Sequence, residues 1–221
     1  EVVAFWEDYR YGDADLMAQK IKVSHGRVMW DSLGVVIDSS RGNQFNYCAS
    51  YQDGVFQLAW EDDRHGDKDI AGRKISAENG ELLGEFALVS DARGRQFDVR
   101  IASGNTGESW HCFLDEQINE VVCQKLDKNN AMAFAPEGLR LNEPHLDFRV
   151  PLEYPVTVSG RNQDAYIAWE DYRTGAKNSD IYLQRLDSLG RNLWRKDGIA
   201  VTTAAGAQNL PKLLPVDGGV Y

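Results

Sequence analysis

The chain has 221 residues, of which 43% are hydrophobic and 26% charged, a balance typical of a folded globular protein and not of a disordered one. Its formal net charge of −10 would repel a phosphate backbone, so we expect no nucleic-acid partner. No run of about 18 apolar residues occurs, and we therefore expect no membrane-spanning helix.

The chain opens in a strand-like pattern over residues 2–6, without the basic and apolar regions of a signal peptide. We expect such a peptide, if there was one, to have been removed or omitted. The strand runs into a motif at residues 6–12, Trp-Glu-Asp-Tyr-Arg-Tyr-Gly, and a second strand follows from Asp15. Nearly the same motif returns at residues 60–66 and 169–175, each time followed by a strand that begins with an aspartate. The chain is therefore built from repeats.

A fourth, degenerate copy lies between the second and the third. The gap from Trp60 to Trp169 is about twice the gap from Trp6 to Trp60, which predicts a copy near the middle. At residues 110–127, Phe113 takes the tryptophan position and Asp115 keeps the motif aspartate. The chain thus holds four units of about 54 residues.

Each unit has the pattern of four short strands. One strand precedes the motif strand, at residues 44–49, 97–102 and 155–159, and a tight turn separates the last two strands. These turns are centred on residues that tolerate a positive φ: Gly26, Gly80, Asn130 and Gly190. No segment shows sustained helical periodicity. The pattern predicts an all-β protein, a four-bladed β-propeller with four-stranded antiparallel blades.

The two ends of the sequence favour a closed ring. The chain starts in the second strand of its first unit and ends, over residues 208–219, in a segment that matches the first strand. We predict that the C-terminal strand completes the first blade, which ties down both termini. In this single propeller domain, the expected blades are 1–40 plus 208–221, 41–91, 92–142 and 143–207.

The repeated Glu, Asp and Arg of the motif could form a catalytic cluster, but an active site occurs once and this set recurs in three units. We predict a structural role: the arginine fork binds the aspartate or loop carbonyls, the glycine allows a sharp turn, and the tryptophan packs between blades with one partner for its indole N–H. The Asp-rich loop 62–69 also suggests Ca²⁺, but its interleaved basic residues weigh against this, and we expect no cofactor.

Three cysteines are present, with no metal-ligand spacing. Cys112 and Cys123 fall on adjacent strands of one predicted hairpin, where they either form a disulfide in an oxidising compartment or stay buried as small hydrophobic residues. Cys48 is left over in both cases.

The pattern Trp-Glu-Asp-x-Arg-x-Gly, followed at residues 180–194 by Asp-Ile-Tyr-x-Gln-Arg-Leu-Asp-x-x-Gly-x-x-x-Trp, resembles repeats of secreted bacterial β-propeller proteins. Residues 187–194 are also similar to the Asp-box turn of sialidase-like propellers, with one extra residue before Trp194. The first resemblance covers three units well and the third unit poorly. It implies a secreted, extracellular or cell-surface protein, often without catalytic activity.

We predict a non-catalytic extracellular module that binds protein, as a surface partner or by self-association. One version is a filament in which the C-terminal strand completes the next molecule. Outside the repeated motif there is no unique cluster of Ser, His and Asp, of paired carboxylates or of metal ligands. We therefore expect no enzyme and no metal site.

Two alternatives involve carbohydrate. A sialidase-like glycoside hydrolase needs carboxylates about 5–10 Å apart across a cleft, and its candidates outside the motif are Arg100, Glu108, Asp115 and Glu116. A lectin would use an exposed aromatic side chain, and its candidates are Trp110, Tyr51 and Tyr154.

The repeat is broken in the third unit and at the insertion 142–151. A break in a repeated pattern either marks a specific contact or reflects drift of one blade. The binding residues that we predict there are Trp110, His111, Asp115, Glu116 and His145.

Overall fold

A computed structural model describes residues 1–142, 152–160, 162–175, 178–216 and 219–220. Within these ranges the chain forms eighteen strands and no helix. Sixteen strands make four antiparallel sheets of four strands each, and the last two form a hairpin. The predicted all-β class and the four four-stranded units are confirmed. No helix in the described ranges is long and apolar enough to cross a membrane.

Each sheet corresponds to one repeat unit, called here blade 1 to blade 4. In blade 1, β1 pairs with β2, and both β3 and β4 pair with β2. The other three blades have their strands in chain order. Blade 1 comprises β1 (Val2–Asp8), β2 (Asp15–Lys22), β3 (Arg27–Val28) and β4 (Val35–Asp38). Blade 2 comprises β5 (Gln44–Gln52), β6 (Val55–Asp62), β7 (Asp69–Ser76) and β8 (Leu82–Ser90).

Blade 3 comprises β9 (Gln96–Ser103), β10 (Ser109–Asp115), β11 (Glu120–Leu126) and β12 (Leu139–Arg140). Blade 4 comprises β13 (Leu152–Ser159), β14 (Ala165–Asp171), β15 (Asp180–Leu186) and β16 (Ile199–Thr202). The terminal hairpin consists of β17 (Pro215–Val216) and β18 (Gly219–Val220).

The register of the central strand pair repeats from blade to blade. The motif aspartate lies opposite the aspartate that begins the next strand, as in Asp8 with Asp15 and Asp62 with Asp69. Blade 3 keeps this register with Asp115 opposite Glu120. The degenerate third motif therefore occupies the same place in its sheet as the regular ones.

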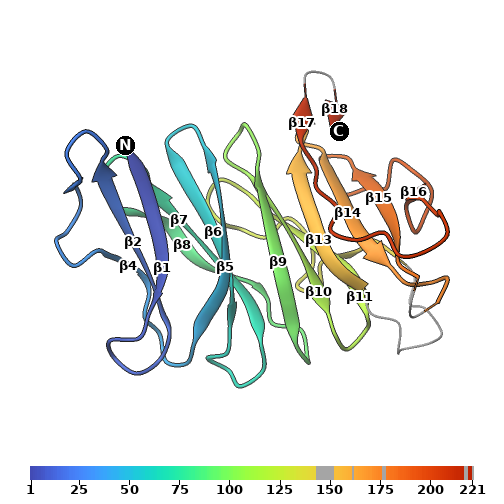
Figure 1. Cartoon of the computed structure of the whole chain (residues 1–221). Helices are drawn as coiled ribbons and strands as arrows, with labels where there is room; N and C mark the ends of the chain where they lie inside the picture. The colour runs from blue at the N-terminus through green and yellow to red at the C-terminus, as the bar shows by residue number, and fades with distance from the viewer. Residues whose placement is uncertain (143–151, 161, 176–177, 217–218, 221) are drawn as a thin grey trace.

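The blades stand side by side, and β5, β9 and β13 follow one another across the molecule (Figure 1). Their neighbouring faces enclose three hydrophobic clusters, one between each pair of adjacent blades. Each cluster contains one aromatic residue from the motif position, fully or almost fully buried: Trp60, Phe113 and Trp169. The motif aromatic thus fills the space between blades, as predicted. Burying such a side chain stabilises the fold by about 1.5–3 kcal/mol.

The structure does not show the predicted closed ring. β1 pairs with β2 alone, whereas the residues expected to complete blade 1 form the β17–β18 hairpin at the other end of the row (Figure 1). The reason lies in residues 208–210, which hydrogen-bond to blade 4: Gln208 N donates to Ser179 O, and Leu210 N donates to Glu170 Oε1. These contacts place the segment beside blade 4. Leu210 there bonds to a motif glutamate in the same way as residues near the start of β5 and β9 do.

Blade 3 contains a disulfide bond. Cys112 on β10 and Cys123 on β11 lie directly opposite each other, with 4.2 Å between their Cα atoms, and both are fully buried. Of the two alternatives for this pair, the disulfide is the one found. Cys48 is free.

We expect the double substitution Cys112→Ala and Cys123→Ala to lower the free energy of unfolding by about 3 kcal/mol, because the bond restricts the unfolded chain over a short loop. Urea denaturation of the wild-type protein with and without reductant, next to the double variant, measures this. The control is Cys48→Ala in the same assay. Equal midpoints for reduced and oxidised wild-type protein would contradict the expectation.

Candidate functional site

The carboxylate of the motif aspartate is the centre of a repeated set of hydrogen bonds. In blade 2, the Trp60 indole donates to Asp62 Oδ2 at 3.0 Å. Arg64 binds the same carboxylate with two nitrogens: Nε donates to Oδ1 at 2.7 Å, and Nη2 donates to Oδ2 at 2.5 Å. Blades 1 and 4 repeat the set around Asp8 and Asp171. The predicted arginine–aspartate fork and the single indole partner are confirmed.

Burial alone would raise the pKa of Asp62, but the hydrogen bonds from Arg64 and from the Trp60 indole outweigh it and hold the pKa below its ordinary value. The ionised carboxylate is therefore the form that the fold stabilises. Because these groups bind one another, they are not available for a substrate.

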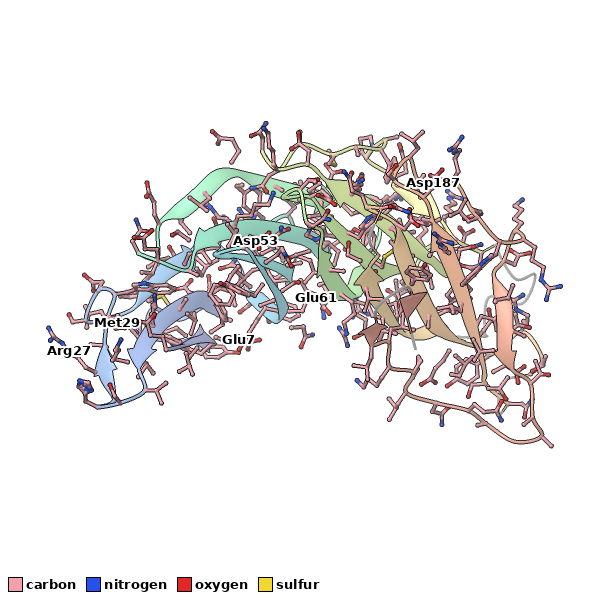
Figure 2. The ribbon with its side chains drawn as sticks, turned by 90° about the horizontal axis from the view of Figure 1, so that it is seen from above. Glu7, Arg27, Met29, Asp53, Glu61 and Asp187 are labelled. Atoms are coloured by element: carbon pink, nitrogen blue, oxygen red, sulfur yellow. A yellow bond between two sulfur atoms is a disulfide. The ribbon has the colours of Figure 1, made fainter. Side chains whose placement is uncertain are left out.

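The motif glutamate joins blade 1 to blade 2 and blade 2 to blade 3. Glu7 Oε1 accepts from the backbone N–H of Asn46 at 3.0 Å, and Glu61 Oε1 accepts from that of Asp98 at 3.1 Å. Leu210 N donates in the same way to Glu170 at 2.5 Å. All three donors have a positive φ, between 50° and 56°. Figure 2 marks Glu7 and Glu61 on two neighbouring blades. The glutamate thus anchors the start of β5 and of β9, and in blade 4 it holds the C-terminal segment.

Three of the predicted binding residues, Trp110, His111 and Asp115, are buried on β10. Trp110 has no exposed surface, and its indole donates to Gln163 O at 3.1 Å. His111 is 1% exposed; its Nε2 lies 2.9 Å from Ser109 Oγ, and burial lowers its pKa to about 3. Because the two residues are adjacent on a strand, their side chains point to opposite faces of the sheet. Trp110 points into the hydrophobic cluster shared with blade 4.

Trp110 and His111 form no common site with the other predicted binding residues that the structure describes, Asp115 and Glu116. Asp115 is 6% exposed and accepts from the backbone N–H groups of Gln117 and Ile118, and burial raises its pKa. Glu116 is exposed and lies 3.5 Å from Arg95. His145 falls outside the described residues. The four described residues therefore do not converge on one surface.

A charged cluster that the sequence did not single out lies at the start of β9. Asp98 is half-buried and next to Glu61, whose Oε2 accepts from Lys68 Nζ at 2.7 Å. Burial is the main cause that raises the pKa of Asp98, and the nearby Glu61 raises this pKa further. Arg100 and Lys68 lower it, but by less. A carboxyl group with a raised pKa suits general acid catalysis.

An open cleft lies between the start of β1 and the β5–β6 hairpin, which reach the same edge of the molecule (Figure 1). It encloses about 740 Å³. Its walls carry Tyr51, which is 59% exposed, and Phe56, with their ring centroids 4.9 Å apart. Lys20 lies at the cleft as well, donating to Ala77 O at 2.8 Å and paired with Glu1 at 2.9 Å. The cleft thus combines an aromatic wall with a few charged groups.

The described part of the chain holds no group of three or more His, Cys, Asp or Glu side chains that could bind a metal ion. In the Asp-rich loop 62–69, the carboxylates at its two ends already have side-chain partners: Asp62 pairs with Arg64, and Asp69 lies 3.1 Å from His65 Nδ1.

The sequence has no match among protein-family models or among curated proteins. The structure is similar to solved β-propeller glycoside hydrolases. With an endo-arabinase of Bacteroides thetaiotaomicron it shares 12% identity at a TM-score of 0.48, covering 90% of this chain and 76% of the other. With an endo-arabinanase of Bacillus licheniformis it shares 13% identity at a TM-score of 0.41, covering 91% of this chain and 76% of the other. With an α-L-arabinofuranosidase of Podospora anserina, solved in complex with cellotriose, it shares 9% identity at a TM-score of 0.44, covering 86% of this chain and 60% of the other.

These similarities correct the prediction that the chain is not an enzyme. That prediction took a regular repeat without a separate catalytic cluster as the mark of a non-catalytic protein, yet the solved structures with a similar arrangement of sheets include several glycoside hydrolases. At 9–13% identity the likeness concerns the fold alone. It assigns no activity or substrate to this chain, and it does not bear out the Asp-box or sialidase resemblance.

We expect Asp62→Asn to destabilise the protein by about 2 kcal/mol at pH 7, because it removes the carboxylate that Arg64 binds with two nitrogens and leaves Arg64 paired with Asp38 alone. Since the pKa of Asp62 is lower folded than unfolded, its contribution exists above its ordinary pKa and is lost as the pH falls. The difference from wild type should therefore shrink towards pH 2. Denaturant titrations at pH 7, 4 and 2 test this, and a pH-independent difference would contradict it.

Proposed function

We propose that this chain binds carbohydrate in the cleft beside Tyr51. The observation that carries the proposal is an exposed tyrosine that forms the wall of an open cleft together with a second aromatic ring. The apolar C–H face of a sugar ring packs on the negative face of an aromatic ring, and its hydroxyl groups need polar partners at the edge. Lys20 and Glu78 line the cleft and supply such partners.

The size of the cleft agrees with this ligand class. A volume of about 740 Å³ lies within the usual range of about 300–1,000 Å³ for small-molecule sites, enough for a short oligosaccharide. Of the three aromatic residues considered for a lectin, Trp110 is buried in the blade interface, and the side chain of Tyr154 lies outside the described part of the structure. Tyr51 is the one that reaches solvent at a cleft. The disulfide in blade 3 supports an oxidising, extracellular location, which we propose for this protein.

We expect Tyr51→Ala to weaken the binding of a neutral oligosaccharide at least tenfold, because the stacking surface is removed. The measurement is isothermal titration calorimetry with cellotriose, xylotriose and arabinotriose. Tyr51→Phe, which keeps the ring, should bind within about threefold of wild type. Tyr11→Ala is the matched control, since Tyr11 is 82% exposed and does not line the cleft. Wild-type protein that binds none of the probes, or a Tyr51→Ala variant that binds them unchanged, would rule the proposal out.

Glycoside hydrolysis at Asp98 is a second candidate function. The observation that favours it is the raised pKa of this half-buried carboxyl group, with Glu61, Lys68 and Arg100 around it. A protonated Asp98 could donate its proton to the oxygen of a glycosidic bond, as the acid of such reactions must. The equivalent position in blade 2 is Asn46, which has the same backbone conformation and the same bond to a motif glutamate.

We expect Asp98→Asn to abolish turnover without loss of stability. Asparagine suits the left-handed conformation, as Asn46 shows, and it removes a carboxylate that burial destabilises. Because the pKa of Asp98 is raised in the fold, the substitution should stabilise the protein more at pH 7 than at pH 4. A panel of nitrophenyl glycosides and dye-linked arabinan, assayed between pH 4 and 8, gives the rates. Absence of turnover by the wild-type protein on the whole panel, or full activity of Asp98→Asn, would exclude this candidate.

A further inference from the structure

The fifth residue of the strand that follows the motif makes the same two kinds of hydrogen bond in three blades. Gln19, Gln124 and Gln184 occupy this position, and each uses both ends of its amide. The oxygen accepts from the next backbone N–H, at 2.9 Å in every case. The nitrogen donates to a carbonyl at the turn before the outermost strand: Asp31 O at 2.6 Å, Ala135 O at 3.0 Å and Arg195 O at 3.0 Å.

Blade 2 has Arg73 at this position. Its outermost strand β8 continues through nine residues, and the register between β7 and β8 breaks between Gly72 and Lys74. In the part of the chain that the structure describes, the buried Nε of Arg73 has no hydrogen-bond partner, and the guanidinium makes no ion pair. A buried donor without a partner destabilises the fold, so this departure from the repeat calls for an acceptor.

Arg73 lines a groove of about 590 Å³ between the outer parts of blades 1 and 2. The other charged groups in the wall satisfy each other: Arg64 donates to Asp38 at 2.8 Å and to Ser40 Oγ at 3.1 Å. Among the charged side chains that line the groove, Arg73 is the one with no ion pair in the described part of the chain, since Arg64 is held by both Asp38 and Asp62. A guanidinium with free donors binds a carboxylate through two parallel hydrogen bonds.

We infer that this groove binds the carboxylate of an acidic sugar, with Arg73 as the residue that holds the charge. The ligand class rests on the carbohydrate binding proposed above. Ser39 and Ser40 offer hydroxyl groups for sugar hydroxyls, and Leu82 and Phe86 give an apolar wall for a ring. A groove that pairs one free guanidinium with hydroxyl and apolar groups suits a uronic acid better than a polyanion, which would need several cations.

The test is calorimetric titration of the full chain with trigalacturonate at low and high salt. We expect wild-type binding to weaken with salt, and Arg73→Gln to weaken it at least tenfold. This variant restores the residue of the other three blades, so it should fold. Arg73→Lys keeps the charge but loses the fork, and should fall in between. Arg27→Gln, at an exposed hairpin outside the groove, should bind as wild type (Figure 2).

Two further arms define the ligand. The methyl ester of trigalacturonate, which lacks the charge, should bind at least tenfold more weakly, whereas an acidic peptide or inorganic phosphate that binds as tightly as trigalacturonate would overturn the sugar assignment. Tyr51→Ala should leave trigalacturonate binding unchanged. Binding of neutral oligosaccharides without binding of trigalacturonate would sink this inference alone. Binding of trigalacturonate that depends on Arg73, in a protein that ignores neutral sugars, would sink the Tyr51 proposal alone.

Discussion

The fold depends on a carboxylate that is held ionised at the end of the motif strand in blades 1, 2 and 4. Asp62 collects the Trp60 indole and the Arg64 guanidinium, and the same triplet recurs in blades 1 and 4. The aspartate fixes the orientation of an aromatic ring that fills the space between two blades. The neighbouring glutamate bonds to the backbone of the next blade. Packing within a blade and packing between blades are therefore set by two consecutive acidic residues.

The structural role of the motif could be predicted because it is local and repeated. Counting the copies separates it from an active site, and the residue types specify the partners: a forked donor, a buried indole and a paired carboxylate. The placement of Cys112 and Cys123 on adjacent strands of one hairpin could be predicted for the same reason, whereas the sequence left open whether they form a disulfide. What the sequence says about a single blade therefore holds well.

Features that depend on several blades could not be predicted in this way. The path of residues 208–210 is decided by Ser179 and Glu170 of blade 4, and no pattern within the segment reveals that choice. The exposure of Tyr51 and the burial of Trp110 follow from which neighbour each aromatic meets. Asp98 and Arg73 were accessible in principle, because an alignment of the four units places them opposite Asn46 and opposite three glutamines. The signal was a departure from the repeat at one position, not a motif.

Such departures are informative because each residue of one blade can be compared with the residues at the same position in the other blades. Where three blades use a glutamine with both amide atoms bonded, Arg73 leaves a buried nitrogen without a partner. Where blade 2 has Asn46, Asp98 places a carboxyl group whose charge is opposed by burial. Each change lowers stability relative to the residue found elsewhere in the same protein. A ligand that binds the folded form offsets that loss by an amount that grows with the logarithm of its concentration over its Kd. A repeat protein can therefore hold an unfavourable residue in one blade while the others keep the regular one, and the unfavourable position is where binding gives the largest gain.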